Sequence, residues 1–133
     1  MGSSGSFLKS GGFKGQEWEQ VGAIDGVKVL RKTGLNGDDK GNLPFYSNTP
    51  GTAYILLNNN GVFRQFRQYG EDRGALFDID FGKHKTDYEY LHIHRFSGKK
   101  RSNEPETIAL PGNAIINKKL YEKYKGFLKG VKL

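Results

Sequence analysis

The sequence predicts an α+β domain in which a C-terminal amphipathic helix packs on a twisted antiparallel β-sheet. Turn signals and strand patterns together favour about five to six hairpin-connected strands. The 19 glycines, among them those of Asp25-Gly26 and Asn60-Gly61, supply many tight turns. Between these turns apolar and polar residues alternate, as they do in half-buried strands. Near the C-terminus the apolar residues instead recur at helical spacing.

The chain has 133 residues, which corresponds to one ordinary domain. Residues 1–15 are rich in Gly and Ser, so we expect a flexible leader, and Met1 to Ser6 resemble a remnant of cloning. Residues 16–133 form the single predicted domain. Nine Phe, seven Tyr and one Trp favour a folded chain, because disordered segments are poor in aromatic residues.

The first predicted element is a β-hairpin near the N-terminus. Strands over 20–24 and 27–31 flank Asp25-Gly26, a pair that tolerates the positive φ angles of a tight turn. Residues 34–51 are rich in Gly, Pro, Asn and Asp and have no periodicity, so we expect a long loop there. A long loop in so small a domain is often functional.

A second hairpin is predicted around residues 58–61, where three asparagines precede a glycine. Its strands cover 53–57 and 62–69. A turn at 71–74 then leads into the next strand.

Two further strands, over 75–81 and 90–96, contain the chemically most informative residues. In the first, apolar residues alternate with Leu76, Asp78 and Asp80, so we expect one apolar face and one acidic face. In the second, Leu91 and Ile93 are expected to point inward and His92 and His94 outward. The loop between the strands contains His84 and Lys85.

The C-terminal third is predicted to contain an exposed basic loop, a short strand and a helix. Residues 97–105 include Lys99, Lys100 and Arg101, and three adjacent cations are usually solvated. A strand is expected over 107–110. From Asn113 onward an amphipathic helix is expected to pack on one face of the sheet. Its apolar residues are Ile116, Leu120, Tyr124 and Phe127.

The charge favours a polyanionic partner. The 21 Lys and Arg outnumber the 14 Asp and Glu, for a formal charge of +7, and nucleic acid is the expected partner. The absence of cysteine excludes disulfides and Cys-ligated metal sites. No apolar run is long enough to cross a bilayer, so we expect no membrane insertion.

All three histidines lie within eleven residues, next to two aspartates. Alternation in strands places Asp78 and Asp80 on one face, and likewise His92 and His94. If the strands pair, a carboxylate can orient an imidazole and raise its basicity. Two imidazoles, one acting as base and one as acid, can cleave RNA by activating the 2′-hydroxyl and protonating the leaving oxygen. The predicted catalytic residues are His84, His92, His94, Asp78 and Asp80.

Two other interpretations of the cluster remain open. Two His with one or two carboxylates can bind a divalent ion, although the chain lacks a specific metal motif such as His-Glu-x-x-His. The histidines can also be polar exterior residues of a half-solvated sheet. The acid–base interpretation needs no cofactor and no metal.

Cations and aromatic residues next to the cluster are candidate substrate ligands. Cations interleaved with aromatics bind single-stranded nucleic acid through phosphate pairing and base stacking, but the same pattern is common in ordinary amphipathic strands. We expect Arg67 or Lys85 to hold phosphate, and Tyr69 or Tyr90 to stack or act as an acid, although packing explains both tyrosines equally well. The candidate ligands are Arg64, Arg67, Arg73, Lys85, Tyr69 and Tyr90.

Residues 67–84, followed by His92-Ile93-His94, resemble a C-terminal module of bacterial polymorphic toxins that also occurs on some phage head-morphogenesis proteins. The shared pattern is an Arg-x-Tyr strand, a Gly turn, Asp78-Ile79-Asp80 with an aromatic, a His, and a later His-x-His. The resemblance implies a ribonuclease fold of the barnase, EndoU, colicin and RelE type. It points to the same five catalytic residues, with Arg67 nearby. The chain departs from it in Arg95-Phe96, where a Trp-containing tail is expected, and in its basic C-terminal helix.

The resemblance implies a metal-independent endoribonuclease toxin whose partner is RNA, with transfer RNA as one candidate. Such a toxin acts in the cytoplasm of a target cell after delivery as part of a larger secreted protein. An acidic immunity protein is expected to cover its basic cleft. The alternatives are a basic nucleic-acid-binding or partner-binding module of phage or secretion origin without catalysis, and a metal-dependent nuclease using the Asp/His cluster.

Overall fold

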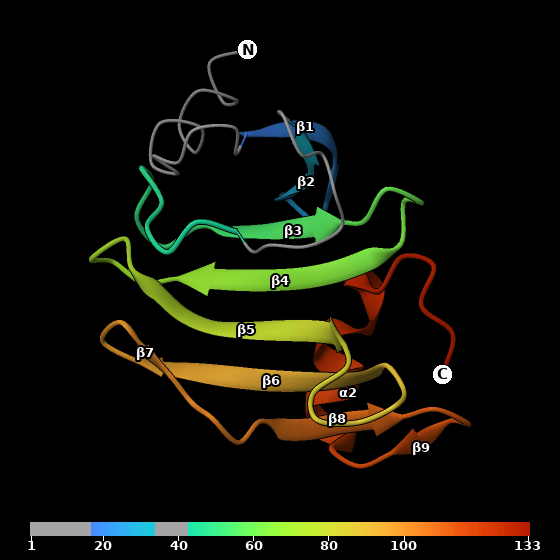
Figure 1. Ribbon diagram of the computed structural model, residues 1–133. Helices are drawn as coiled ribbons and strands as arrows, with labels where there is room; N and C mark the ends of the chain where they lie inside the picture. The colour runs from blue at the N-terminus through green and yellow to red at the C-terminus, as the bar shows by residue number, and fades with distance from the viewer. Residues whose placement is uncertain (1–16, 34–42) are drawn as a thin grey trace.

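The computed structural model describes residues 17–33 and 43–133. The predicted leader and residues 34–42 of the predicted long loop lie outside the described residues. Within the described part, the predicted α+β class is confirmed, because one mixed, mostly antiparallel sheet carries a C-terminal helix (Figure 1). Over residues 17–33 and 43–133 the sheet has nine strands rather than five or six, and two of these, at 100–101 and 114–115, have only two residues each.

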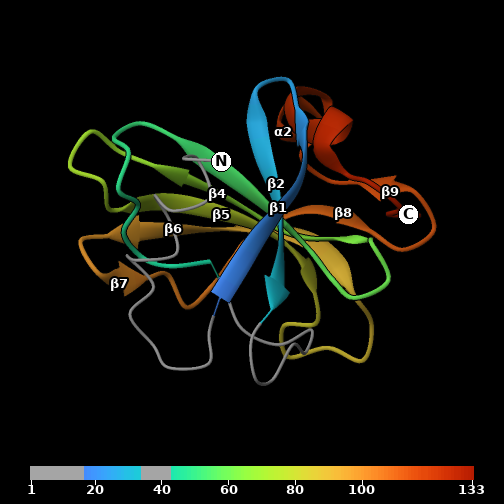
Figure 2. The same ribbon diagram turned by 90° about the horizontal axis from the view of Figure 1, so that it is seen from above.

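The strands follow one another along the chain with few departures from neighbour pairing. They are β1 (Glu17–Ile24), β2 (Val27–Thr33), β3 (Ala53–Leu57), β4 (Phe63–Tyr69), β5 (Ala75–Gly82), β6 (Tyr90–Ser97), β7 (Lys100–Arg101), β8 (Glu106–Leu110) and β9 (Ala114–Ile115). Their order in the sheet is β1-β2-β3-β4-β5-β6-β8-β9, and β7 pairs with β6. Seen from above, β1 and β2 cross the direction of the central strands, so the sheet is strongly twisted (Figure 2).

One strand pair departs from the predicted antiparallel arrangement, because β2 and β3 are parallel. A parallel pair needs a long crossover connection, and the segment between Thr33 and Ala53 supplies it. In the described second half of this connection Leu43 and Pro44 are buried, and Tyr46 forms a bridge to Gly74. This part of the predicted long loop therefore packs on the sheet.

The predicted hairpin turns are confirmed. Asp25 and Gly26 have φ angles of 48° and 81°, as a tight turn between β1 and β2 requires. In the β3–β4 turn Gly61 has a φ of 78°, and the Asn58 side chain accepts hydrogen bonds from the backbone N–H groups of Asn60 and Val62. The Asn side chain therefore satisfies turn donors that the ladder leaves free.

The C-terminal helix is shorter than predicted. It comprises α2 (Lys118–Tyr124) and a following 3₁₀ turn, η1 (Lys125–Phe127), and Asn117 caps it by accepting a hydrogen bond from the Leu120 N–H. Ile116, predicted to belong to the apolar face, precedes the helix and is 60% exposed. The cap at Asn117 sets the start, which sequence periodicity alone did not locate.

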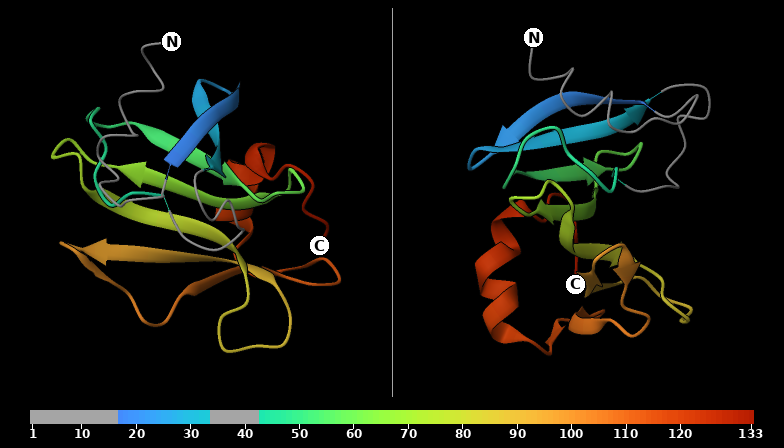
Figure 3. Two further views of the ribbon diagram at one scale, coloured as in Figure 1. Left: turned by 45° about the horizontal axis from the view of Figure 1, so that its top comes forward. Right: turned by 90° about the vertical axis from the view of Figure 1, so that its left-hand side faces the viewer.

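The two faces of the sheet have different covers. Leu120, Tyr124 and Phe127 of the C-terminal segment pack on one face, over a core that includes Phe66, Ile79 and Ile93. The opposite face has its own apolar cluster at one end: Trp18, Leu30, Leu43, Tyr54, Leu56, Tyr69 and Ala75. Figure 3 (right) shows α2 on one side of the sheet and the β5–β6 loop on the other.

Candidate functional site

The two aspartates and two strand histidines share the sheet face that α2 leaves free. In the antiparallel pair β5–β6, Asp78 lies opposite His94 and Asp80 lies opposite His92. Residues directly opposite in such a pair point to the same face. Apolar Ile79 is paired with Ile93 and belongs to the core beneath the helix. The shared face that alternation predicts is therefore present in the structure.

The prediction that this face is solvent-exposed is wrong. His92 is 3% exposed, His94 is 2% exposed and Asp78 is fully buried. The rings of all three histidines are neighbours, with centroids 5.1 Å apart for His92 and His94, and 5.8 Å and 5.2 Å from His84 to these two. The β5–β6 loop thus brings His84 over β6, and the cluster becomes a covered polar site rather than a solvated surface.

Arg67 is one of two arginines that pair with the aspartates of this cluster. Its Nη2 donates to Asp78 Oδ2 at 2.8 Å, and its Nε donates to the other carboxylate oxygen. Its Nη1 donates to the Leu43 carbonyl at 2.6 Å. Burial alone would lower the pKa of Arg67, but the hydrogen bonds and charge of Asp78 raise it above its ordinary value. These contacts engage Arg67 inside the protein and stand against the phosphate-binding role expected of it, which stays a prediction.

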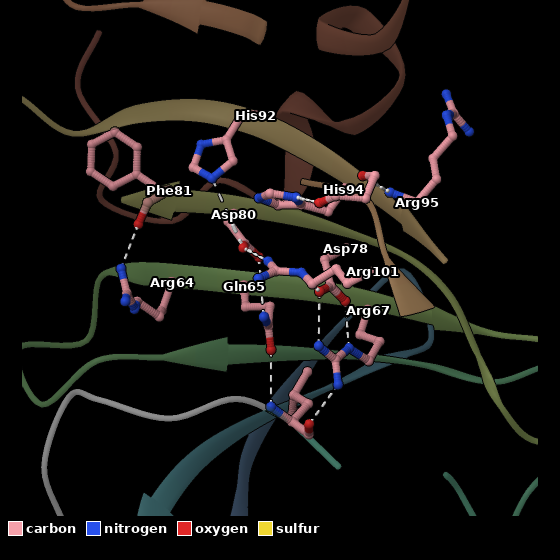
Figure 4. A network of polar contacts seen from close by, with 12 residues as sticks. Arg64, Gln65, Arg67, Asp78, Asp80, Phe81, His92, His94, Arg95 and Arg101 are labelled. Atoms are coloured by element: carbon pink, nitrogen blue, oxygen red, sulfur yellow. Dashed lines mark hydrogen bonds and ion pairs between the residues drawn. The ribbon is translucent and has the colours of Figure 1, made fainter. Parts of the chain in front are cut away.

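Arg101 is the second of these arginines and was missed by the sequence analysis. Its Nη2 donates to Asp80, and its Nε lies 3.2 Å from Asp78 Oδ2 (Figure 4). Arg101 lies in β7 and pairs with Phe96 of β6, so its segment folds back over the sheet. Lys99 and Lys100 stay exposed, as predicted. No sequence signal identified Arg101, because the burial of Asp78, which calls for a balancing cation, is itself a tertiary feature.

Gln65 is a further missed residue. Its Nε2 donates to Asp80 Oδ1 at 3.1 Å, and its Oε1 accepts from the Leu43 N–H at 2.9 Å. Alternation along β4 places Gln65 on the same face as Arg67, so the pattern contained this signal. Gln65 therefore ties Asp80 to the segment that covers the site.

Both strand imidazoles have a defined tautomer. His92 Nδ1 lies 3.0 Å from the Tyr90 carbonyl oxygen, and His94 Nδ1 lies 2.9 Å from that of Ser102. A carbonyl only accepts, so each Nδ1 donates and each Nε2 carries a lone pair. Burial lowers the pKa of His92 to about 4 and also lowers the pKa of His94. Both imidazoles are therefore neutral near neutral pH, with Nε2 able to accept a proton, and the expected rise in their basicity is wrong because burial outweighs the nearby carboxylate.

A small open hollow gives access to this cluster. His92 and Asp80 lie in its wall, and Arg64 and Lys83 add two positive charges. Arg64 Nη1 donates to the Phe81 carbonyl at 2.9 Å, which holds its guanidinium across Gly82. Lys83 was not singled out from the sequence. The hollow is lined by Arg64, Gln65, Asp80, Gly82, Lys83 and His92.

The other predicted substrate ligands lie elsewhere or are engaged. Arg73 is exposed in the β4–β5 turn, at the end of β5 away from the β5–β6 loop. Lys85 is exposed, with Nζ 3.8 Å from a Glu104 carboxylate oxygen. Buried Tyr69 donates to the Pro44 carbonyl, and burial raises its pKa, which opposes a role as a proton donor. Tyr90 is buried, with its hydroxyl 3.5 Å from the His84 carbonyl oxygen.

Acid is expected to destabilise the fold through His92. Its pKa is about 4 in the folded chain against 6.5 ordinarily, so the unfolded state binds more protons between these values. The free energy of unfolding should therefore fall as pH drops from 6.5 to 4, by about 2–3 kcal/mol from this group. Denaturant unfolding at a series of pH values measures the effect. A His92→Gln variant should lose this part of the pH dependence, and an unchanged slope would contradict the assignment.

Comparisons of the chain with models of protein families, with curated proteins and with solved structures found no match. The resemblance to toxin modules therefore stays a prediction. In the described part of the chain, no helix is long and apolar enough to span a membrane.

Proposed function

We propose that this domain is a toxin-type endoribonuclease that cleaves RNA with histidines and without a metal ion. One observation carries the proposal: an imidazole with a free Nε2, that of His92, lies in the wall of a hollow that also contains the cations Arg64 and Lys83. A proton acceptor beside two phosphate-pairing groups is an arrangement that can cleave a phosphodiester of RNA without a metal ion.

In this mechanism His92 Nε2 accepts the proton of a ribose 2′-hydroxyl. The 2′-oxygen then forms a bond to the adjacent phosphorus, and the bond from phosphorus to the 5′-oxygen breaks. His84, which follows the hollow-lining Lys83 on the β5–β6 loop, acts in its protonated form and donates its proton to the departing 5′-oxygen. Arg64 and Lys83 stabilise the negative charge on the phosphoryl oxygens in the transition state.

The carboxylates support the base. Asp80 Oδ2 lies 4.0 Å from His92 Nε2, so its negative charge stabilises the imidazolium that forms during proton transfer. Arg101 and Gln65 hold this carboxylate in place. Asp78 and Arg67 are assigned a structural role, because they are paired with each other and buried.

The mechanism requires RNA as the substrate, since DNA has no 2′-hydroxyl. The net charge of +7 supports a polyanionic substrate, and transfer RNA is one candidate. A toxin of this kind implies an acidic immunity protein that covers the basic hollow. Co-expression of the acidic immunity protein should then restore the growth of cells that produce the domain. Normal growth of cells that produce the domain alone would oppose the toxin assignment.

The direct test compares an RNA oligonucleotide with DNA of the same sequence, each with and without EDTA. We expect cleavage of RNA alone, unchanged by the chelator, with a 2′,3′-cyclic phosphate at the new end. RNA left intact would overturn the proposal. Loss of cleavage in EDTA would favour a metal-dependent nuclease, and salt-sensitive binding without cleavage would favour a binding module.

Arg64 provides a test of the phosphate contacts. Replacing it with glutamine should reduce kcat/KM for RNA by about 10–100-fold, because a hydrogen bond to a charged group contributes about 1.5–3 kcal/mol. The salt dependence of binding should also become shallower by about one charge. The matched control is Arg31→Gln, since Arg31 is exposed on β2 and pairs only with Glu19 in the described contacts. Equal losses in both variants would contradict the role of Arg64.

A further inference from the structure

We propose that Asp80, His92 and His94 form a binding site for a divalent transition-metal ion of the zinc class, which His84 can complete. The inference concerns metal binding alone and stands independently of ribonuclease activity. It rests on the donor geometry of the cluster and on a buried imidazole nitrogen that has no hydrogen-bond partner among the described residues.

The donor atoms are close enough for a shared ion. One ligand atom from each of Asp80, His92 and His94 lies within 4.8 Å of the others. Tetrahedral zinc with bonds of about 2.0–2.1 Å places its ligand atoms about 3.4 Å apart. Side-chain rotations that shorten the distances between the ligand atoms by about 1–1.5 Å therefore close the site around an ion. Two imidazoles and a carboxylate suit Zn²⁺ or Co²⁺, whereas Mg²⁺ prefers oxygen ligands.

Both histidines are already oriented as metal ligands. Their Nδ1 atoms donate to the carbonyls of Tyr90 and Ser102, which leaves each Nε2 free on the side of the cluster. Metal-bound histidines usually donate their other ring nitrogen to a carbonyl or carboxylate, and this contact fixes the ring. The second layer of contacts that a metal site needs is therefore present.

His84 offers a further ligand. Among the residues that the structure describes, its buried Nε2 has no hydrogen-bond partner. Its ring centroid is 5.2 Å from that of His94 and 5.8 Å from that of His92. Three imidazoles bound through Nε2 to one tetrahedral ion have centroids about 5 Å apart, from the same bond lengths. A buried nitrogen without a partner is costly, and an ion would satisfy it.

Arg101 competes with a metal ion for the carboxylate of Asp80. Its guanidinium donates to Asp80 and lies beside Asp78, so the two arginines balance the two aspartates. An ion must take a carboxylate oxygen from Arg101 or from Gln65. Removing the positive charge of Arg101 leaves the cluster with one net negative charge and should strengthen metal binding.

The test uses tag-free protein, stripped with chelator and desalted, and titrated with Zn²⁺ by calorimetry and with Co²⁺ by visible absorption. We expect one ion per chain, no competition from Mg²⁺, and the intense Co²⁺ bands of a low-coordinate nitrogen site. His92→Gln and His94→Gln should each weaken Zn²⁺ binding at least about tenfold, and His84→Gln should weaken it less. Arg101→Gln should tighten it.

A second measurement does not depend on variants that fold poorly. In the wild-type chain, Zn²⁺ should shift the ¹⁵N resonances of His92 and His94 Nε2 at one equivalent. Absence of binding at millimolar Zn²⁺, or binding that leaves these resonances in place, would overturn the inference. If the domain is the proposed ribonuclease, the ion binds the lone pair of His92 Nε2, the general base, and therefore inhibits RNA cleavage. Activation by Zn²⁺ would support the site and overturn metal-independent cleavage.

Discussion

His92→Ala is expected to reduce the rate of RNA cleavage by about 10²–10⁴-fold, the usual contribution of a general base. His92 is the strand histidine in the wall of the hollow, and its Nε2 is the free proton acceptor there. The affinity for RNA should change little, because Arg64 and Lys83 supply the charges that pair with phosphate. Single-turnover cleavage and RNA binding, measured on the same preparation, separate the two effects.

The comparison with His94→Ala makes this prediction specific. His94 has the same tautomer and similar burial, but it does not line the hollow. Its loss should therefore cost at least tenfold less activity than the loss of His92, by the same scale for proton transfer. Circular dichroism and thermal unfolding check that both variants fold. Wild-type cleavage by a folded His92→Ala variant would rule out His92 as the base.

Asp78→Asn is expected to lower the free energy of unfolding by about 3–5 kcal/mol. The substitution keeps the shape of the side chain but leaves the buried guanidinium of Arg67 without its counter-charge. An uncompensated buried charge is costly, whereas the intact pair contributes little beyond a hydrophobic replacement. Denaturant unfolding at neutral pH measures the loss.

Two companion variants test this explanation. Asp87→Asn, at an exposed position of the β5–β6 loop, should change stability by no more than about 0.5 kcal/mol. Arg67→Met combined with Asp78→Leu removes both charges and should be more stable than Asp78→Asn. A double variant less stable than the single one would show that the hydrogen bonds of Arg67 to the Leu43 and Pro44 carbonyls, rather than its charge balance, dominate.

Much of the sheet was predictable because its signals are local. Asp25-Gly26 and Asn60-Gly61 identified two hairpin turns, and alternation assigned Asp78, Asp80, His92 and His94 to one face. The start of α2 was less predictable, because Ile116 continues the apolar spacing although the cap lies at Asn117. The parallel pairing of β2 with β3 depends on a long connection that has no periodicity.

The candidate site also has features that local sequence patterns predict and features that only tertiary contacts set. The identity of the strand residues and their common face follow from side-chain alternation, which each strand determines by itself. Whether that face meets water does not. Leu43, His84 and Arg101 come from three separate segments that fold over the strands, and their contacts turn a predicted surface patch into a buried network.

The sequence by itself therefore determined the strands, the turns and the grouping of histidines with aspartates, because φ preferences and the two-residue period of a strand are properties of short segments. Only the tertiary structure decided that Arg67 is buried and paired with Asp78, that Arg101 joins the aspartates, and that His92 alone among the strand histidines lines the hollow. These outcomes depend on which distant segments cover a face, and buried charges then select the partners that balance them.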